Sequence, residues 1–373
     1  MRIIHTADWH LGRIFYERYL TEDQAYTLQD FSALVRDYRP DAVVVAGDIY
    51  DRAVPPTEAV HLWDDIVTEL SYADIPLIAI SGNHDSTDRL SYGTRLLRES
   101  GVYIYGMAEA DTAPLVLHDA VGPVYFCPFA FADPATIRIK YDEPQVRDYD
   151  SLFRVQAERL LQQVPLSARR IAVAHAFVAG GSPSDSERPL SVGGSSQVGT
   201  DAFQDFHYTM LGHLHRPQTM AEGKLRYSGS LLKYSFNEAD QQKGVDLVEI
   251  DAMGAVQRES VTLRKRHDLR IITGAFQELM GDLTPSSDDY LLLRLTNEAP
   301  VLAAMSRLRE KFPNVLALEP IGLKAQQGER TTADIRRLTY TDMFAQFIED
   351  VGGRPLDEAE AQVMTEVWQE AES

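Results

Sequence analysis

The chain of 373 residues contains a single cysteine, Cys127, so it cannot form an internal disulfide bond. Cys127 stands in the apolar run VYFCPFAF, which predicts a buried thiol. No apolar run reaches the roughly 18 residues that a transmembrane helix needs, and the N-terminus lacks the apolar core of a signal peptide. We therefore expect a cytoplasmic protein that does not cross a membrane.

Basic residues are few: 36 Lys and Arg face 56 Asp and Glu, a net charge of −20. This balance argues against tight binding of a polyanion by the protein surface alone, although divalent cations or a partner subunit can supply positive charge. The chain also lacks the G-x-x-x-x-G-K-[ST] pattern of ATP-binding loops, because the glycine-rich stretch at 193–200 contains no lysine. We expect no ATP hydrolysis by this chain itself.

The first half of the chain alternates between apolar runs and stretches with helical spacing. Continuous apolar runs indicate strands covered on both faces, and they occupy residues 2–6, 42–46, 77–81 and 171–174. Two segments with apolar side chains every three or four positions predict helices, at 57–72 and 88–100. Strands that alternate with helices favour a layered α/β fold.

The pattern changes after residue 224. Short strand-like runs then predict a sheet edge that closes a first domain at 1–264. Residues 265–325 predict a small α/β capping domain, with strands at 290–296 and 315–318 around a helix at 300–312.

The C-terminal part is acidic, with ten Asp and Glu but three Arg from Asp334 to Ser373. After a linker at 326–332, residues 333–373 predict a helical tail with amphipathic helices at 340–350 and 357–370.

Polar side chains follow five apolar runs where each predicted strand ends. They are Asp8 and His10; Asp48 and Asp51; Asn83, His84 and Asp85; His175; and His213 and His215. Since ligands of open α/β sheets bind at the carboxyl ends of strands, the five segments should meet at one rim. Oxygen and imidazole donors without a thiolate suit Mn²⁺, iron or Zn²⁺. Two such metals can clamp a phosphate and activate a water, and the neighbouring glycines allow close approach of the backbone.

Five sequence blocks carry a family resemblance: HTADWHLG (5–12), VVVAGDIYDRAVPP (43–56), GNHDS (82–86), LGHLHRPQ (211–218) and RYSGSLL (226–232). They are similar to the calcineurin-like metallophosphoesterases and, among these, to bacterial nucleases of the Mre type. The resemblance runs from residue 1 to about residue 237 and continues more loosely to the C-terminus. It implies a layered α/β metallophosphoesterase β-sandwich flanked by helices, with a capping domain and a helical tail.

The resemblance also implies roles for the site residues. One metal is held by Asp8, His10 and His215, the second by Asn83, His175 and His213, and Asp48 bridges the two. His84 is not a ligand but faces the scissile phosphate and donates a proton or a hydrogen bond. Asp85 is expected beside it, orienting His84, and Asp51 is a further candidate for orienting a neighbour.

For function, the resemblance implies a Mn²⁺-dependent DNA nuclease with two metal ions. It hydrolyses phosphodiesters by a metal-activated water, as an exonuclease on duplex ends and an endonuclease on single strands and hairpins, in DNA end processing, repair and recombination. The implied partners are DNA, a second copy of the chain bound through helices near 57–100, and an ATPase subunit. The tail either docks on the coiled-coil base of that ATPase or packs back on its own chain.

Two other functions stay open at this point. A small-molecule phosphoesterase with the same metal site would explain the acidity, but not the capping domain or the tail. A non-enzymatic scaffold is disfavoured by the complete ligand set and by His84. Outside the set, His5 is expected to be a core histidine with satisfied hydrogen bonds, and Trp9 either packs in the core or touches substrate.

Overall fold

The computed structural model describes residues 1–109, 111–187, 196–322, 345, 357 and 360–364. Its first sheet has the strand order β16-β15-β1-β4-β5-β6. These strands are β1 Arg2–Thr6, β4 Ala42–Ala46, β5 Leu77–Ile80, β6 Val102–Tyr105, β15 Gly244–Ile250 and β16 Val256–Thr262. Strands β1, β4, β5 and β6 run parallel, so their carboxyl ends lie at one edge.

The second sheet has the order β13-β14-β12-β9-β8-β7. Its strands are β7 Leu115–Asp119, β8 Gly122–Phe129, β9 Arg169–His175, β12 Tyr208–Gly212, β13 Gln218–Met220 and β14 Leu225–Tyr227. Strands β8, β9, β12 and β14 are parallel to one another. The inner faces of the two sheets share a core that includes Ile3, Val44, Phe126 and Val173.

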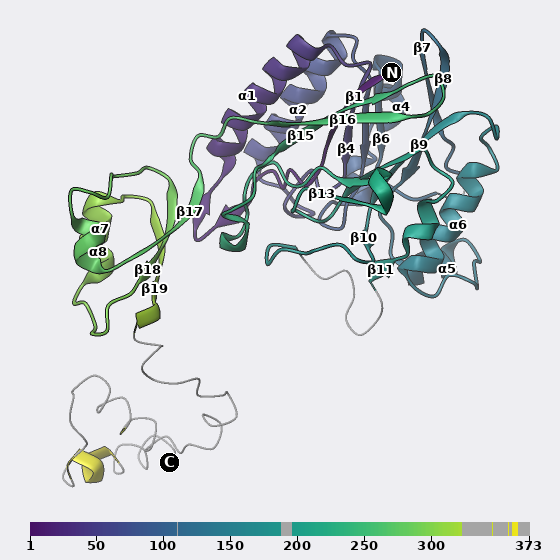
Figure 1. Ribbon diagram of the computed structural model, residues 1–373. Helices are drawn as coiled ribbons and strands as arrows, with labels where there is room; N and C mark the ends of the chain where they lie inside the picture. The colour runs from purple at the N-terminus through teal and green to yellow at the C-terminus, as the bar shows by residue number, and fades with distance from the viewer. Residues whose placement is uncertain (110, 188–195, 323–344, 346–356, 358–359, 365–373) are drawn as a thin grey trace. The chain divides into compact units, whose positions relative to one another are not determined.

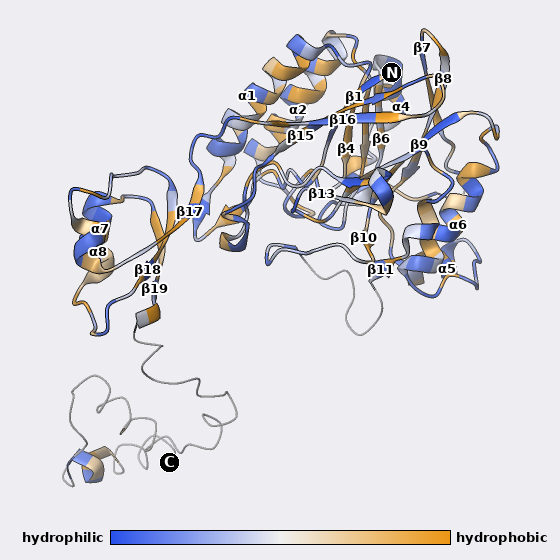
Figure 2. Ribbon diagram, viewed as in Figure 1, coloured by the Kyte–Doolittle hydropathy of each residue, from blue (hydrophilic) through white to orange (hydrophobic). Residues whose placement is uncertain are grey.

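Helices cover the outer face of each sheet (Figure 1). Helices α1 (Thr21–Tyr38) and α2 (Thr57–Tyr72) pack on the first sheet, and α5 (Pro134–Lys140) and α6 (Tyr149–Leu161) lie beside the second. Figure 2 shows mainly apolar strands at the centre and two-faced helices outside, as burial of one helix face requires. The order helix, sheet, sheet, helix confirms the layered α/β fold.

Several sequence-based predictions of individual elements need correction. The helix expected at 88–100 is broken into α3 (Thr87–Leu90), α4 (Thr94–Leu97) and a 3₁₀ turn (Arg98–Ser100), because Gly93 adopts a left-handed φ of 73° between them. Helix α1 was not predicted. The thiol of Cys127 is buried as expected, and burial raises its pKa to about 12.

Shorter elements complete the first part of the chain. They are β2 Ile14–Phe15, β3 Arg18–Tyr19, β10 Phe177–Val178, β11 Gln197–Val198 and three further 3₁₀ turns at Thr200–Phe203, Ala221–Gly223 and Phe236–Glu238. No helix among the described residues combines the length and the apolar composition that crossing a membrane takes.

Contacts divide the chain into two units: Met1–Ile271 with Ser287–Leu292 and Asn314–Leu316, and the remainder. A small sheet of order β17-β18-β19 is formed by Leu269–Gly274, Tyr290–Leu295 and Val315–Pro320, with helices α7 (Phe276–Met280) and α8 (Ala304–Lys311). Helix α8 begins later than predicted because Ala303 has a left-handed φ, which leaves Leu302 exposed. The domain boundaries at 264 and 325 stay predictions, and the tail at 333–373 lies almost wholly outside the described residues.

An inter-sheet cluster is defined as His5, Arg226, Asp246, Arg258 and Ser260. His5, Arg226 and Asp246 are buried between the two sheets, and Arg258 and Ser260 cover them from the exposed side. Arg226 on β14 makes a two-pronged ion pair with Asp246 on β15, with N–O distances of 2.6 and 3.0 Å. His5 on β1 is fully buried, so its expected place in the core is confirmed, although neither ring nitrogen makes a hydrogen bond of normal geometry among the described residues. Burial lowers the pKa of His5 to about 4, which leaves the ring neutral.

Candidate metal centre

The polar residues that follow five strands meet at one place. Strands β1, β4 and β5 of the first sheet and β9 and β12 of the second all point their carboxyl ends toward it. The two sheets are joined there directly, because the backbone N–H of His213 donates to Asp8 Oδ1 at 2.9 Å. We call Asp8, His10, Asp48, Asn83, His175, His213 and His215 the candidate metal centre. All but Asn83 are buried.

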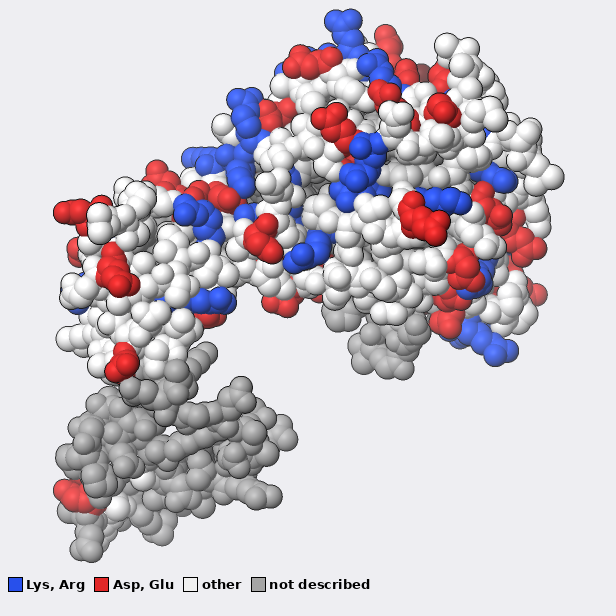
Figure 3. Space-filling model, viewed as in Figure 1, with Lys and Arg blue, Asp and Glu red and all other residues white. Residues whose placement is uncertain are grey.

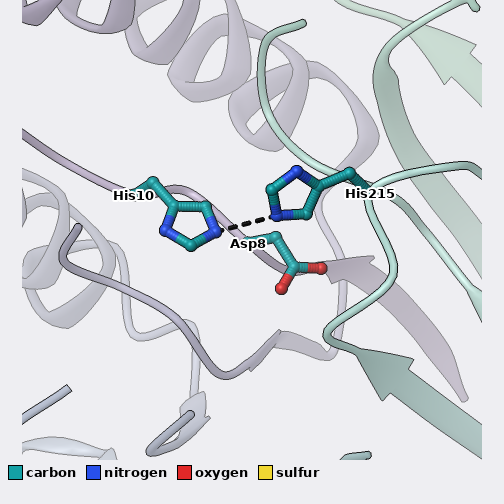
Figure 4. Close-up of side chains that lie close together, drawn as sticks. All are labelled: Asp8, His10 and His215. Atoms are coloured by element: carbon teal, nitrogen blue, oxygen red, sulfur yellow. Dashed lines mark hydrogen bonds between the residues drawn. The ribbon is translucent and has the colours of Figure 1, made fainter. Parts of the chain in front are cut away.

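One group of donors consists of Asp8, His10 and His215 (Figure 4). The Nε2 atoms of the two histidines face each other at 2.9 Å. Asp8 Oδ2 is buried, yet it has no hydrogen-bond partner among the described residues. Buried polar atoms without partners are costly, so this arrangement fits a missing cationic partner.

A second group lies around Asn83. Its Oδ1 atom is 3.0 Å from His175 Nε2 and 3.0 Å from His213 Nδ1. His175 donates its Nδ1–H to the carbonyl of Ala46 at 2.9 Å, which leaves Nε2 of the neutral ring without a proton. Two acceptors this close need a cation or an extra proton between them.

Asp48 lies between the groups. Its Oδ2 atom is 3.4 Å from His175 Nε2 and 3.6 Å from His10 Nε2. Donors bonded at about 2.1 Å to one cation and at right angles are roughly 3 Å apart, which matches the spacing within each group. The donor types and their spacing therefore fit a divalent metal site at these residues.

The pKa values of the candidate metal centre also indicate a shortage of positive charge around its carboxylates. Burial raises the pKa of Asp8 to about 8, although His175 opposes this shift. Burial alone would lower the pKa of His175, but Asp48 outweighs it and raises the pKa to about 9. The pKa of His10 and of His213 is well below its usual value because both rings are buried. Without a cation, the centre therefore takes up protons at Asp8 and His175.

The backbone is strained at the same residues. Asp8, His10, Asp48 and His213 have φ angles of 53°, 46°, 50° and 101°, in the region that side chains other than glycine rarely adopt. Such conformations cost about 1–3 kcal/mol each and gather at functional sites. Gly212 allows a close approach between the two sheets, since a Cβ there would lie 1.9 Å from the Ala46 carbonyl oxygen.

His84 borders the candidate metal centre, and with His10 and Asp48 it forms a further group of donor atoms that lie within 4.8 Å of one another. Its ring packs edge-on against His10 with centroids 4.5 Å apart, and its Nε2 is 4.0 Å from Asp48 Oδ2. Its Nδ1–H donates to the carbonyl of Asp51 at 2.7 Å. Asp51 thus orients His84 through its backbone, while its carboxylate pairs with Arg13 at 3.1 Å.

The prediction that Asp85 orients His84 is corrected. The Asp85 carboxylate accepts the backbone N–H groups of Ile49, Tyr50 and Gly82 at 2.9–3.1 Å instead. It therefore fixes the loop after β4 to the loop after β5. Consecutive side chains at a sharp turn point in different directions. For this reason His84 and Asp85 are adjacent in the sequence but their side chains have different partners.

Trp9 is core. It is fully buried, packs edge-on against Phe31 and Trp63, and donates its indole N–H to Thr6. The substrate contact left open above is thereby excluded for this conformation.

Sequence reasoning missed the side chains that hold the ligand loops. Gln24 on α1 is fully buried, donates to the carbonyls of Trp9 and His10 at 3.2 and 2.8 Å, and accepts the N–H of Gly12 at 3.0 Å. Glu187 accepts the backbone N–H of His215 at 2.7 Å. Both stand in polar stretches of sequence that resemble surface, so no local signal marks Gln24 as buried or Glu187 as half-buried.

Comparisons with known proteins agree with this geometry. Residues 1–217 match the calcineurin-like phosphoesterase family, and residues 265–351 match the type 5 capsule protein repressor C-terminal domain. The chain is 33% identical over 324 residues to the SbcD subunit of the SbcCD nuclease from Staphylococcus epidermidis, covering 86% of each protein. The solved structure of TT1561 from Thermus thermophilus covers 69% of this chain and 98% of its own at 12% identity, with a TM-score of 0.39, too distant to bear on function.

Proposed function

The chain belongs to the calcineurin-like phosphoesterases, in the branch that contains the SbcD subunit of the SbcCD nuclease, and we propose from this premise that it is the nuclease subunit of an SbcCD complex. The proposed activity is Mn²⁺-dependent hydrolysis of DNA phosphodiesters, as an exonuclease on duplex ends and an endonuclease on single strands and hairpins. The observation that carries the proposal is the pair of donor groups that share Asp48, with His84 beside them.

We assign the donors as the spacing suggests. Asp8, His10 and His215 would hold one cation, Asn83, His175 and His213 the other, and Asp48 both. Two bound cations supply Lewis acidity at a phosphate and lower the pKa of water. The protein contributes the fixed orientation: His175 is held by the Ala46 carbonyl, and the His10 loop is held by Gln24.

His84 is assigned to the substrate. Because its Nδ1–H is committed to Asp51, only Nε2 is free to face a phosphate oxygen. As an imidazolium, His84 donates a hydrogen bond or a proton from Nε2 to the charge that develops on the phosphate or on the leaving oxygen.

Partners follow from the same premise. With no ATP-binding loop of its own, the chain would depend on an SbcC-type ATPase for cutting duplex DNA. Figure 3 shows acidic and basic side chains interspersed on the visible face rather than a broad basic surface. With a net charge of −20, we expect weak DNA binding by the chain alone.

The proposed homodimer would use the surface of α2, α3 and α4. An open groove of about 640 Å³ lies there, lined by Val60, Trp63, Val67 and Tyr92 among others. Val60 and Tyr92 are exposed, and an apolar surface of this kind is typical of an interface. The tail at 333–373 is proposed to bind the ATPase.

The test is cleavage of a labelled hairpin DNA by the purified chain with Mn²⁺, beside His84→Ala. The matched control is His118→Ala, which changes an exposed histidine on β7 far along the chain from the ligand blocks. Cleavage by the wild type and the control but not by His84→Ala supports the proposal. Turnover of a small phosphodiester without any cutting of DNA, even with the ATPase subunit and ATP, would instead support the small-molecule phosphoesterase.

A further inference from the structure

The ring nitrogen of His215 that points away from Asp8 faces a second buried polar system. His215 Nδ1 lies 2.6 Å from Ser186 Oγ, and Ser186 Oγ donates in turn to Glu238 Oε1. Glu238 Oε1 is 3.5 Å from His215 Nδ1, so the serine hydroxyl stands between the ring and the carboxylate. Ser186 and His215 are at most 8% exposed, and Glu238 is completely buried.

The carboxylate is fixed by partners of its own. Lys243 Nζ pairs with Glu238 Oε2 at 2.8 Å, and the backbone N–H of Tyr234 donates to the same atom at 3.2 Å. Lys243 also donates to the His215 carbonyl at 2.6 Å, so the ion pair is tied to the residue that it serves. A buried carboxylate with an ammonium partner is an acceptor, which sets the direction of every proton in the chain.

That direction determines the form of His215. Because Glu238 accepts from Ser186, the serine oxygen is left to accept from His215, and the proton of the neutral ring lies on Nδ1. Nε2 then presents its lone pair toward Asp8 and His10 (Figure 4). His175 and His84 are oriented by neutral carbonyls of Ala46 and Asp51, whereas His215 alone among these three has a carboxylate behind it.

We propose that Ser186 and Glu238 are positioning residues for His215, which hold its Nε2 toward the cation shared with Asp8 and His10 and strengthen it as a ligand. The inference rests on the proposed function. Groups that orient a ligand histidine in this way typically contribute 10- to 100-fold, roughly, to metal affinity. We expect the effect on one of the two cations, since the donors around Asn83 have no contact with Ser186 or Glu238 among the bonds described.

The experiment measures Mn²⁺ binding by calorimetry and by electron paramagnetic resonance, independently of activity. Ser186→Ala and Glu238→Gln are compared with the wild type, with Ser186→Thr, which keeps the hydroxyl, and with Ser32→Ala, which changes a buried serine on α1. We expect the wild type to bind two Mn²⁺ ions. In Ser186→Ala and in Glu238→Gln, the affinity for one of these ions should fall by about 10- to 100-fold. Affinity should be restored in Ser186→Thr and unchanged in Ser32→Ala.

Other outcomes separate the two ideas. Two Mn²⁺ bound with unchanged affinity by Ser186→Ala would overturn the positioning role and leave the proposed function intact, and this variant keeps the test open if Glu238→Gln fails to fold. Absence of any Mn²⁺ binding by the wild type would overturn the proposed function and this inference together. An equal loss of affinity for both Mn²⁺ ions would also contradict the inference, because it would indicate a general effect on the structure.

Discussion

The inter-sheet cluster and the candidate metal centre both bury carboxylates between the same two sheets, but they balance the charge differently. Asp246 in the cluster is surrounded by Arg226, Arg258 and the Ser260 hydroxyl. At the centre, the ion-pair partners found for Asp8 and Asp48 within the described residues are all histidines. Arginine neutralises Asp246 and histidines lower the pKa of Asp48, whereas burial raises the pKa of Asp8, which is the carboxylate left without sufficient positive charge.

This difference teaches how a fold prepares a metal site. Burial would raise the pKa of Asp246, but Arg226 outweighs it and the pKa is below its usual range. The pKa of Asp8 is raised by burial to about 8, because His175 offsets only part of the effect of burial. Among the described residues no arginine pairs with Asp8, so the proposed metal would not compete there with a fixed guanidinium.

The largest effect is expected from breaking the compensated pair. Arg226→Ala should lower the free energy of unfolding by about 3–5 kcal/mol, because Asp246 keeps its buried charge without its main partner. The matched control is Arg154→Ala, an exposed arginine paired with Asp150, which should cost less than about 1 kcal/mol. Urea-induced unfolding measures both, and equal losses would show that burial does not set the difference.

The next effect is the stabilisation of the centre by its cation. Mn²⁺ at about 100 times its dissociation constant should raise the free energy of unfolding by about 2.7 kcal/mol relative to protein in EDTA. Asp8→Asn should lose part or all of this gain, yet be no less stable than the wild type in EDTA, because a neutral amide replaces a carboxyl group whose charged form burial already disfavours. A variant that is stabilised by Mn²⁺ as much as the wild type would remove Asp8 from the ligand set.

The two regions should also respond to pH with opposite sign. The pKa of Asp246 is lowered by folding, so its contribution to stability is present above its unfolded pKa of about 3.9 and is lost as the pH falls through the folded pKa. The pKa values of Asp8 and His175 are raised to about 8 and about 9, so their contributions are complete below their unfolded pKa values and are lost as the pH rises through these values.

Metal-free protein should therefore lose stability between about pH 4, the unfolded pKa of an aspartate, and about pH 9, the folded pKa of His175. Protein saturated with Mn²⁺ should not lose stability in this way, because the bound ligands are already deprotonated. Urea unfolding across this range in EDTA and in Mn²⁺ measures the difference. Parallel profiles would contradict the assigned protonation of Asp8 and His175.

The sequence predicts the polar residues at the centre far better than the residues that support them. Apolar runs locate β1 and β4 to the residue, and a donor that directly follows a strand is carried by that strand to the shared rim. Supporting contacts join distant segments: Gln24 and Tyr234 are 210 residues apart, and Ser186 and His215 are 29 apart. The direction of a side chain at a turn also cannot be read from the sequence, and for this reason Asp85 was predicted to contact His84.

The smallest effect should come from Ser260→Ala, which tests whether the compensation of Asp246 is redundant. The Ser260 hydroxyl donates to Asp246 Oδ1 at 2.5 Å and accepts from Arg258 at 2.6 Å. Its loss should cost about 1 kcal/mol, as for one hydrogen bond, because Arg226 still holds both carboxylate oxygens. The acid limb of the stability profile should keep its position, since that ion pair continues to lower the pKa of Asp246. A loss of stability as large as that of Arg226→Ala would mean that the Asp246 carboxylate needs all of its partners together. The inter-sheet cluster would then resemble the candidate metal centre, because its charge would not be compensated once a single partner was removed.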